Sequence, residues 1–206
     1  MPFREIAVAA TRERSMREGP GIRYVIWVQG CSLKCKGCFN PHFWSQHGGS
    51  SRDIDSLLHE VIAARIKFPE IEGVTFLGGE PFEQPEALAE LSQKLQKLDF
   101  SIMVFTGYTL AELKDEKSSH YVSRLNFLSS IDLLVDGRYQ QDNVDIDRPW
   151  VGSKNQEFHF LTERYSKETL FNSVKDGLEI TVLNSGEVQI NGWATDSQLE
   201  SLLEKL

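Results

Sequence analysis

The chain has no long apolar run, no excess of positive charge and only three cysteines. Its first apolar stretch ends before the charged segment Thr11-Arg12-Glu13-Arg14, which is too early for a signal peptide. No later stretch is long and apolar enough to span a bilayer. The sequence therefore predicts a cytoplasmic protein with no membrane partner.

Basic residues are scarce. The chain has 22 Lys and Arg against 30 Asp and Glu, which gives a net charge of -8. Sequence-independent binding of nucleic acids depends on clustered Lys and Arg that displace counterions from phosphates. No such cluster is present, so we expect no nucleic-acid partner. With 206 residues, 40% hydrophobic and 25% charged, the chain is predicted to form one globular domain over 1–206.

All three cysteines lie in the segment Gly30-Cys31-Ser32-Leu33-Lys34-Cys35-Lys36-Gly37-Cys38. Three thiolates so close together can face one metal centre, although tetrahedral zinc sites and complete four-iron clusters normally take four protein ligands. A four-iron cluster held by Cys31, Cys35 and Cys38 would keep one iron open. One disulfide would leave an odd thiol, and a chance cluster of structural thiols is disfavoured because reactive thiols beside two lysines bring no benefit.

Short apolar, β-branched runs alternate with helical segments along most of the chain. Strands are predicted at 24–28, 74–77, 102–105 and 131–135, and helices at 54–66, 86–98 and around 110–113. Such alternation indicates an α/β fold of parallel β/α units. A complete eight-unit barrel needs about 250 residues. This chain supplies four or five units, so we expect a partial, open β/α barrel of parallel strands with outer helices.

The tail has a different pattern. The segments 178–183 and 187–190 flank Asn184-Ser185-Gly186, which predicts a C-terminal β-hairpin. Leucines at helical spacing predict a last helix over 197–206. We therefore expect a core over about residues 3–160 and a C-terminal extension over about 161–206.

Polar or glycine-rich segments follow the predicted strands. They are the cysteine segment, Gly78-Gly79-Glu80-Pro81, Thr106-Gly107-Tyr108 and Asp136-Gly137-Arg138. In parallel α/β folds, ligands bind at the carboxyl edge of the sheet, where these segments are expected to meet. The sequence thus predicts one site at this edge.

The motifs and their order are similar to those of the radical S-adenosylmethionine superfamily, and within it to the glycyl-radical-enzyme activases. The resemblance rests on Gly19-Pro20-Gly21-Ile22-Arg23, the cysteine spacing with Phe39-Asn40-Pro41, and Gly78-Gly79-Glu80-Pro81. The segments at 106–108, 136–139 and 152–156 also resemble that family's later motifs. The chain most resembles the anaerobic ribonucleotide reductase activating proteins, over roughly residues 3–160.

This resemblance implies an enzyme with a [4Fe-4S] cluster and S-adenosylmethionine as cofactors. An electron donor of the flavodoxin or ferredoxin type reduces the cluster, and cleavage of S-adenosylmethionine gives methionine and a 5′-deoxyadenosyl radical. That radical takes a hydrogen atom from a glycine of a glycyl-radical enzyme, which the resemblance suggests is anaerobic ribonucleotide reductase. The protein supplies positioning and exclusion of water.

The residues after the second predicted strand and those next to the cysteines are expected to contact the cofactor. Gly78 and Gly79 allow the backbone to approach the cofactor's ammonium and accept from it through carbonyls. Glu80 adds negative charge there, although Gly-Gly-Glu also suits an ordinary turn. Phe39 is a candidate to stack on adenine. Asn40 either makes a hydrogen bond near the cluster or ends the turn.

Three further residues are expected to bind the cofactor. Arg138 offers a planar fork for the methionine carboxylate. Asp136 either orients Arg138 or is a solvated turn acid. Thr106 either meets the ribose through its hydroxyl or caps a helix.

Two other functions remain open from the sequence. One is a radical S-adenosylmethionine enzyme that modifies a small molecule or a peptide. The other is a non-catalytic iron–sulfur electron carrier, for which the segments after the second and fourth strands would be incidental. Formation of 5′-deoxyadenosine separates the carrier from both enzymes.

Overall fold

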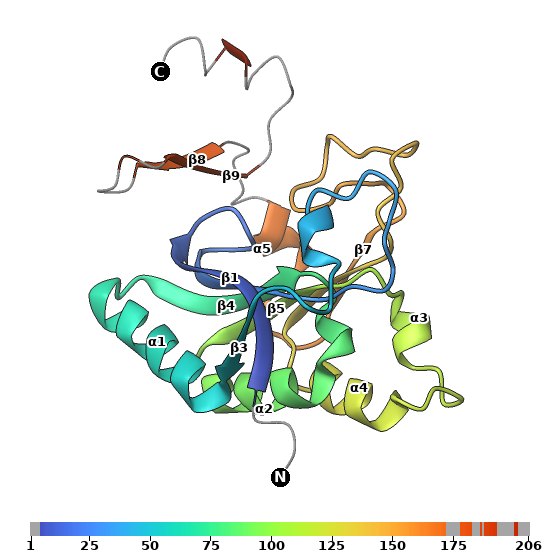
Figure 1. Cartoon of the computed structure of the whole chain (residues 1–206), viewed down its shortest axis with the longest axis horizontal. Helices are drawn as coiled ribbons and strands as arrows, with labels where there is room; N and C mark the ends of the chain where they lie inside the picture. Colours follow the sequence, from blue (N-terminus) through green and yellow to red (C-terminus); the bar gives the residue numbers. More distant parts are fainter. Residues whose placement is uncertain (1–4, 172–177, 183–185, 187, 193–199, 202–206) are drawn as a thin grey trace.

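The computed structural model describes residues 5–171, 178–182, 186, 188–192 and 200–201. This part of the chain forms a mixed α/β fold in which α1, α2 and α4 cover one face of a seven-stranded sheet (Figure 1). The strands of the sheet are β1 (Glu5–Ser15), β2 (Ile22–Val28), β3 (Ser50–Asp53), β4 (Ile71–Gly78), β5 (Ser101–Phe105), β6 (Leu133–Asp136) and β7 (Glu157–Phe160). The helices are α1 (Ile54–Lys67), α2 (Pro85–Gln96), α3 (Leu110–Leu113), α4 (Tyr121–Leu128) and α5 (Lys167–Phe171), with 3-10 turns η1 (Pro41–Phe43) and η2 (Pro81–Glu83). Of these described helices, none has the length and apolar character needed to cross a bilayer.

The strand order is β3-β1-β2-β4-β5-β6-β7. The central strands β2, β4, β5 and β6 run parallel, which confirms the predicted β/α alternation. Their register aligns Val28 with Gly78 and Phe105 with Val135. The segments that follow these four strands therefore meet at one edge of the sheet.

The expectation of an entirely parallel sheet is wrong. β1, β3 and β7 pair antiparallel with their neighbours, whereas the four predicted strands β2, β4, β5 and β6 are parallel and are joined by three helical crossovers. Parallel pairing requires a crossover, usually a helix. A short turn over 16–21 links β1 to β2, and no helix lies between β6 and β7 in the chain, so both connections return antiparallel. In the described residues the sheet is open, with β3 and β7 at its edges.

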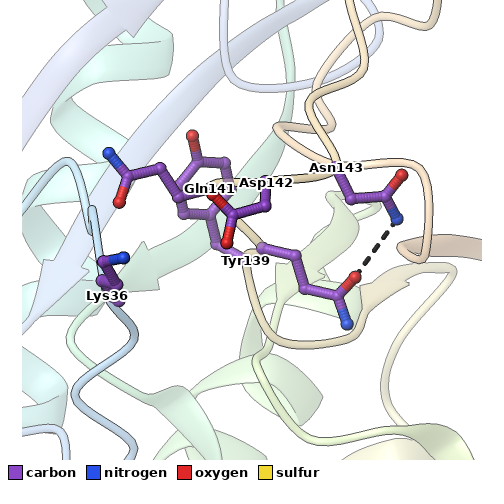
Figure 2. Close-up of a pocket in the computed structure, with 6 residues that line it drawn as sticks. Lys36, Tyr139, Gln141, Asp142 and Asn143 are labelled. Atoms are coloured by element: carbon purple, nitrogen blue, oxygen red, sulfur yellow. Dashed lines mark hydrogen bonds between the residues drawn. The ribbon is translucent and has the colours of Figure 1, made fainter.

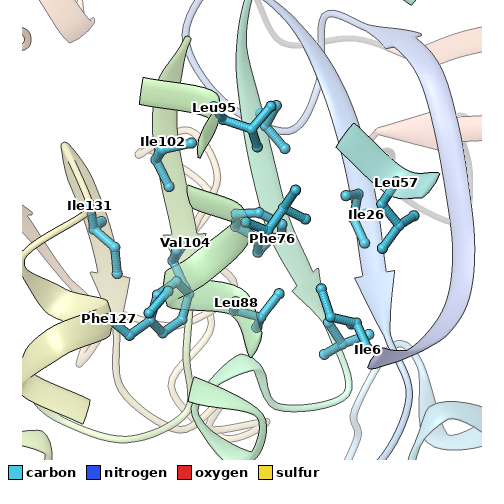
Figure 3. Close-up of a cluster of buried hydrophobic side chains, with 14 of the residues drawn as sticks. Ile6, Ile26, Leu57, Phe76, Leu88, Leu95, Ile102, Val104, Phe127 and Ile131 are labelled. Carbon is cyan, nitrogen blue, oxygen red and sulfur yellow. The ribbon is translucent and has the colours of Figure 1, made fainter. Parts of the chain in front are cut away.

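The main hydrophobic core lies between the sheet and the three large helices (Figure 3). Alternate residues of the parallel strands point toward the helices, so that Ile26, Phe76 and Val104 have no exposed surface and Leu88 of α2 packs against them. Burying side chains of this size contributes about 2 kcal/mol each. α1 begins where the Asp53 carboxylate accepts two backbone N–H groups, as the sequence predicts.

The opposite face of the sheet carries a smaller apolar cluster, to which α5 contributes Leu170. Beside it lies the fully buried Arg23, at the start of β2. Its guanidinium donates to the hydroxyls of Thr75 (2.6 Å), Ser101 (3.0 Å) and Tyr165 (3.2 Å). This polar network fills the amino end of the parallel strands, opposite the edge that carries the candidate site.

The predicted C-terminal hairpin is confirmed: β8 (Leu178–Val182) pairs antiparallel with β9 (Val188–Gly192). The Glu179 carboxylate accepts a hydrogen bond from the Ser15 hydroxyl (2.9 Å) and lies 3.7 Å from the Arg12 guanidinium. The hairpin is thereby attached to β1. The turn residues 184–185 and most of the helix predicted over 197–206 lie outside the described residues.

Candidate active site

The cysteine loop follows β2 and is closed at its base by backbone hydrogen bonds. The Gly30 N–H donates to the Phe43 carbonyl (2.8 Å), and the Cys31 N–H donates to the Trp44 carbonyl (3.2 Å). Residues 31–44 therefore form a compact loop whose ends lie side by side. All three cysteines belong to it.

The three thiols of this loop are free. Cys31 is buried, whereas Cys35 and Cys38 are partly exposed. Burial raises the pKa of the Cys31 thiol, and the backbone N–H groups of the following residues partly offset this. Burial also raises the pKa of Cys35, and the nearby Cys38 adds to the effect. A metal centre would have to displace these protons, as iron and zinc do when they bind thiols.

The donor set suits an iron–sulfur cluster. Thiolates bind such clusters, and backbone N–H groups directed at the sulfurs tune them; here the Asn40 N–H lies 3.4 Å from Cys38 Sγ. Within the part of the chain that the structure describes, no three Cys, His, Asp or Glu side chains surround a single ion position. A four-iron cluster does not need such a point, because each cysteine binds a different iron.

The glycine-rich loop after β4 is tied directly to the base of the cysteine loop. The Gly79 N–H donates to the Val28 carbonyl and the Glu80 N–H to the Gly30 carbonyl, both at 2.8 Å. Gly78 has φ +112°, and a Cβ at Gly79 would lie 2.2 Å from the Gly30 carbonyl oxygen. Glycine is therefore required for this close approach of two backbones.

Glu80 points into the protein and is almost fully buried. Its carboxylate accepts from the Phe82 N–H (2.9 Å), the Thr106 hydroxyl (2.7 Å) and the Gly107 N–H (2.8 Å). Burial raises the pKa of Glu80 to about 7 although these three donors favour the ionised form. The side chains of Glu80 and Thr106 thus hold the loops after β4 and β5 together, and the expectation that Thr106 caps a helix is wrong, because Thr109 caps α3 instead.

Replacing Glu80 by Gln is expected to alter how stability depends on pH. Between about pH 4.5 and 7 the folded protein holds a proton that the unfolded chain has released, so this group makes the free energy of unfolding fall as pH rises. The loss is on the order of 3 kcal/mol across the window. Urea unfolding of the cluster-free protein at pH 5, 6 and 7 should show a flatter dependence for Glu80→Gln. The exposed Glu86→Gln variant should keep the wild-type slope, and a wild-type slope in Glu80→Gln would contradict the assignment.

Asp136 does not orient Arg138, and it is not a solvated turn acid, so both expectations for it are wrong. It is buried at the end of β6, where its Oδ2 accepts from the Leu110 N–H at 2.6 Å and lies 2.9 Å from His159 Nε2. The carboxylate thus joins β6, the start of α3 and β7. The antiparallel pairing of β7 decides this arrangement, because it places His159 beside β6.

Arg138 instead pairs with Glu112 on α3. Its Nη1 lies 2.9 and 3.1 Å from the two carboxylate oxygens, and the guanidinium stands 5.8 Å from the centre of the Tyr108 ring. Glu112 also completes the capping box with Thr109 at the start of α3. The spacing Thr-x-x-Glu identifies such a box in a sequence, but it does not indicate the partner of Arg138. In this structure the Arg138 guanidinium, which was predicted to bind the carboxylate of the cofactor, binds the carboxylate of Glu112.

The turn at 137–138 is braced by residues of the later sequence motif. The Asn155 amide donates to the Arg138 carbonyl (2.8 Å), and the Gln156 amide donates to the Gly137 carbonyl (3.1 Å). The motif at 152–156 therefore shapes the segment that carries Arg138.

Phe39 lies at the outer side of the cysteine loop and is 64% exposed. Its ring centre is 5.4 Å from that of Tyr139, which follows Arg138. Asn40 precedes η1, as expected for a residue that ends the turn. The loops after β2 and β6 thus lie side by side, as Figure 1 also shows.

A shallow pocket of about 280 Å³ lies between these two loops (Figure 2). It is lined by Lys36, Tyr139, Gln140, Gln141, Asp142 and Asn143. None of the predicted cofactor residues belongs to this lining, although Arg138 directly precedes Tyr139 in the chain. The pocket therefore marks the rim of the candidate site.

Comparison with known proteins shows similarity over the part of the chain that carries the candidate site. A family model described as a 4Fe-4S single cluster domain matches residues 17–159. The chain is 36% identical over 152 residues to the anaerobic ribonucleoside-triphosphate reductase-activating protein of Vibrio cholerae, which covers 70% of this chain and 91% of that protein. The protein of the same name from Escherichia coli K12 is 30% identical over 151 residues, covering 69% and 91%. Among solved structures, QueE from Escherichia coli has a TM-score of 0.42 and 20% identity, over 51% of this chain and 54% of that chain.

Proposed function

Because the chain belongs to the family of anaerobic ribonucleoside-triphosphate reductase-activating proteins, we propose that it generates a glycyl radical on such a reductase by cleaving S-adenosylmethionine. One observation supports this above others: the base of the loop with three free thiols is bound to the backbone of Gly79 and Glu80 at the carboxyl edge of the parallel strands. Ligands of parallel α/β folds bind at this edge.

Cys31, Cys35 and Cys38 would hold a [4Fe-4S] cluster in this proposal. When bound, the cluster and S-adenosylmethionine supply a one-electron reduction that splits the cofactor into methionine and a 5′-deoxyadenosyl radical able to take hydrogen from glycine. The backbone at Gly78 and Gly79 would bind the cofactor's ammonium. Glu80 would support this loop from the protein interior, because its carboxylate is already bound there.

Arg138 would bind the cofactor's carboxylate after leaving Glu112. The exchange of one carboxylate for another preserves the charge-assisted hydrogen bonds of the guanidinium. Thr106 and Phe39 would lie near the ribose and the adenine, and Asn40 beside the cluster. These roles fit the convergence of the loops after β2, β4, β5 and β6.

The face of the sheet opposite α1, α2 and α4 would serve as the concave side of an open barrel. A polypeptide loop of the reductase could then enter from the side without threading a closed pore. An electron donor of the flavodoxin or ferredoxin type would reduce the cluster. Residues 161–206, beyond the segment matched by the family model, would form an extension of one domain.

The test mixes the anaerobically reconstituted, reduced protein with S-adenosylmethionine and the reductase of the same host. A glycine-centred doublet in the electron paramagnetic resonance spectrum is expected, with one cofactor consumed per radical. Cofactor cleavage without this signal, together with faster turnover on a peptide or metabolite, would instead indicate the small-substrate enzyme. Absence of 5′-deoxyadenosine would indicate an electron carrier.

Arg138 variants should separate cofactor binding from cluster binding. Arg138→Ala is expected to weaken binding of S-adenosylmethionine by about 10- to 100-fold, since a hydrogen bond to a charged group contributes about 1.5–3 kcal/mol. The affinity of Arg138→Lys for S-adenosylmethionine should lie between those of the wild type and Arg138→Ala, because lysine keeps the charge but not the planar fork. Glu112→Gln should tighten binding by releasing Arg138. Anaerobic calorimetry measures the affinity, and iron content confirms the cluster.

Arg164 provides a matched control, since it is another partly exposed arginine paired with a carboxylate, that of Asp99 (2.8 Å). Arg164→Ala should leave the affinity unchanged. An unchanged dissociation constant in Arg138→Ala would remove Arg138 from the site.

A further inference from the structure

Glu83 ties the two central loops of the site together. It lies in η2, directly after the glycine-rich loop, and its Oε1 accepts from both the N–H (2.7 Å) and the hydroxyl (2.5 Å) of Ser32. Its Oε2 accepts from the side-chain amide of Gln46 (3.0 Å). Ser32 follows Cys31 at the entrance of the cysteine loop, and Gln46 lies just beyond its exit. One carboxylate therefore holds both ends of the loop.

Gln46 is itself placed closely against the base of the loop. Gly30 has φ +96°, and a Cβ there would come within 2.4 Å of the Gln46 Oε1. The Gln46 side chain thus lies against Gly30, and Glu83 fixes its amide end. Hydrogen bonds to a carboxylate are stronger than those between neutral groups, so the three contacts hold the segment next to Cys31 firmly.

Glu83 also places negative charge near Cys31. Its carboxylate binds Ser32, the residue that directly follows Cys31. A metal centre bound through Cys31 would experience the field of this charge. Adding an electron to such a centre becomes less favourable next to a negative charge.

We propose that Glu83 is a positioning residue for the iron–sulfur cluster: it fixes the loop segment that carries Cys31, and its charge lowers the cluster's reduction potential. The inference rests on the proposed function in that it requires a bound cluster. It goes beyond that function because Glu83 lies outside the segments on which the resemblance rests and has no role in the proposed binding of S-adenosylmethionine.

Two substitutions separate the effect of the charge of Glu83 from the effect of its side-chain length. Glu83→Gln keeps the length and an acceptor for Ser32 but removes the charge. Glu83→Asp keeps the charge but is one methylene shorter, so it cannot span both Ser32 and Gln46. Glu86→Gln removes an exposed carboxylate from the first turn of α2 and serves as the control.

The first measurement is a potentiometric titration of the reconstituted proteins, followed by electron paramagnetic resonance. In Glu83→Gln the equilibrium should shift about tenfold toward the reduced cluster, which is 59 mV for one electron. Glu83→Asp and Glu86→Gln should keep the wild-type potential. The second measurement is amide hydrogen exchange at Ser32 in the cluster-free proteins, which should become about tenfold faster in Glu83→Asp and stay unchanged in Glu86→Gln.

A wild-type potential in Glu83→Gln overturns the electrostatic role, and unchanged exchange at Ser32 in Glu83→Asp overturns the positioning role. If Glu83→Gln does not retain a cluster, amide exchange at Ser32 in cluster-free Glu83→Asp decides. Faster exchange than in the wild type supports the positioning role, and unchanged exchange refutes it. A wild-type protein that binds no cluster refutes the proposed function itself, so the two failures are distinguishable.

Discussion

Replacing Cys35 by alanine is expected to abolish cleavage of S-adenosylmethionine. Three thiols are available in the chain, so losing one leaves a four-iron cluster with two protein ligands. Loss of a hydrogen-bond partner of a metal ligand already lowers metal affinity or activity by about 10- to 100-fold. Loss of a ligand should lower them further. Formation of 5′-deoxyadenosine by the reduced protein, measured by chromatography, should fall by more than about 100-fold.

Lys34→Ala is the matched control, because it removes an exposed side chain from the same loop but keeps the backbone N–H directed at Cys31. It should retain its iron and its cleavage rate. If Cys35→Ala holds a full cluster and cleaves the cofactor at the wild-type rate, the ligand assignment is wrong. Iron and sulfide analysis of both variants reports the cluster independently of the reaction.

Replacing Arg23 by methionine is expected to lower the free energy of unfolding by about 4 kcal/mol. Besides three hydroxyls, the guanidinium satisfies the backbone carbonyls of Pro20, Val74 and Ser101. Each buried acceptor left without a donor costs about 1–3 kcal/mol, and some can find other partners. The cost is a large fraction of the roughly 5–15 kcal/mol by which a domain is usually stable. Urea unfolding of the cluster-free protein measures it.

Arg14→Met is the control for this experiment. Arg14 is a partly exposed arginine on β1, paired with Glu70 at 2.9 Å. Exposed ion pairs contribute about 0–1 kcal/mol, so the control should change stability little. Equal effects of the two substitutions would contradict the structural role of Arg23.

The sequence by itself determined the features that depend on local order. Alternation of β-branched strands with amphipathic helices predicted β2, β4, β5 and β6 because each strand and helix follows from neighbouring residues. The cysteine spacing and the motifs around it predicted the family, which the matching relatives confirm. The hairpin of β8 and β9 was predictable for the same reason, since its two strands are close together in the sequence. Cluster and cofactor binding by the named residues stays a prediction.

Only the tertiary structure decided which polar side chains face each other. Glu83 and Ser32 are 51 positions apart, Arg138 and Glu112 are 26 apart, and Arg23 and Ser101 are 78 apart. Such partners are set by strand order and by the antiparallel return of β7, which no local pattern specifies. Asp136 shows the consequence most clearly: although it lies only two residues before Arg138 in the chain, it binds the start of α3 and lies beside His159 of β7. Burial disfavours an unpaired carboxylate more strongly than adjacency in the sequence favours any one partner.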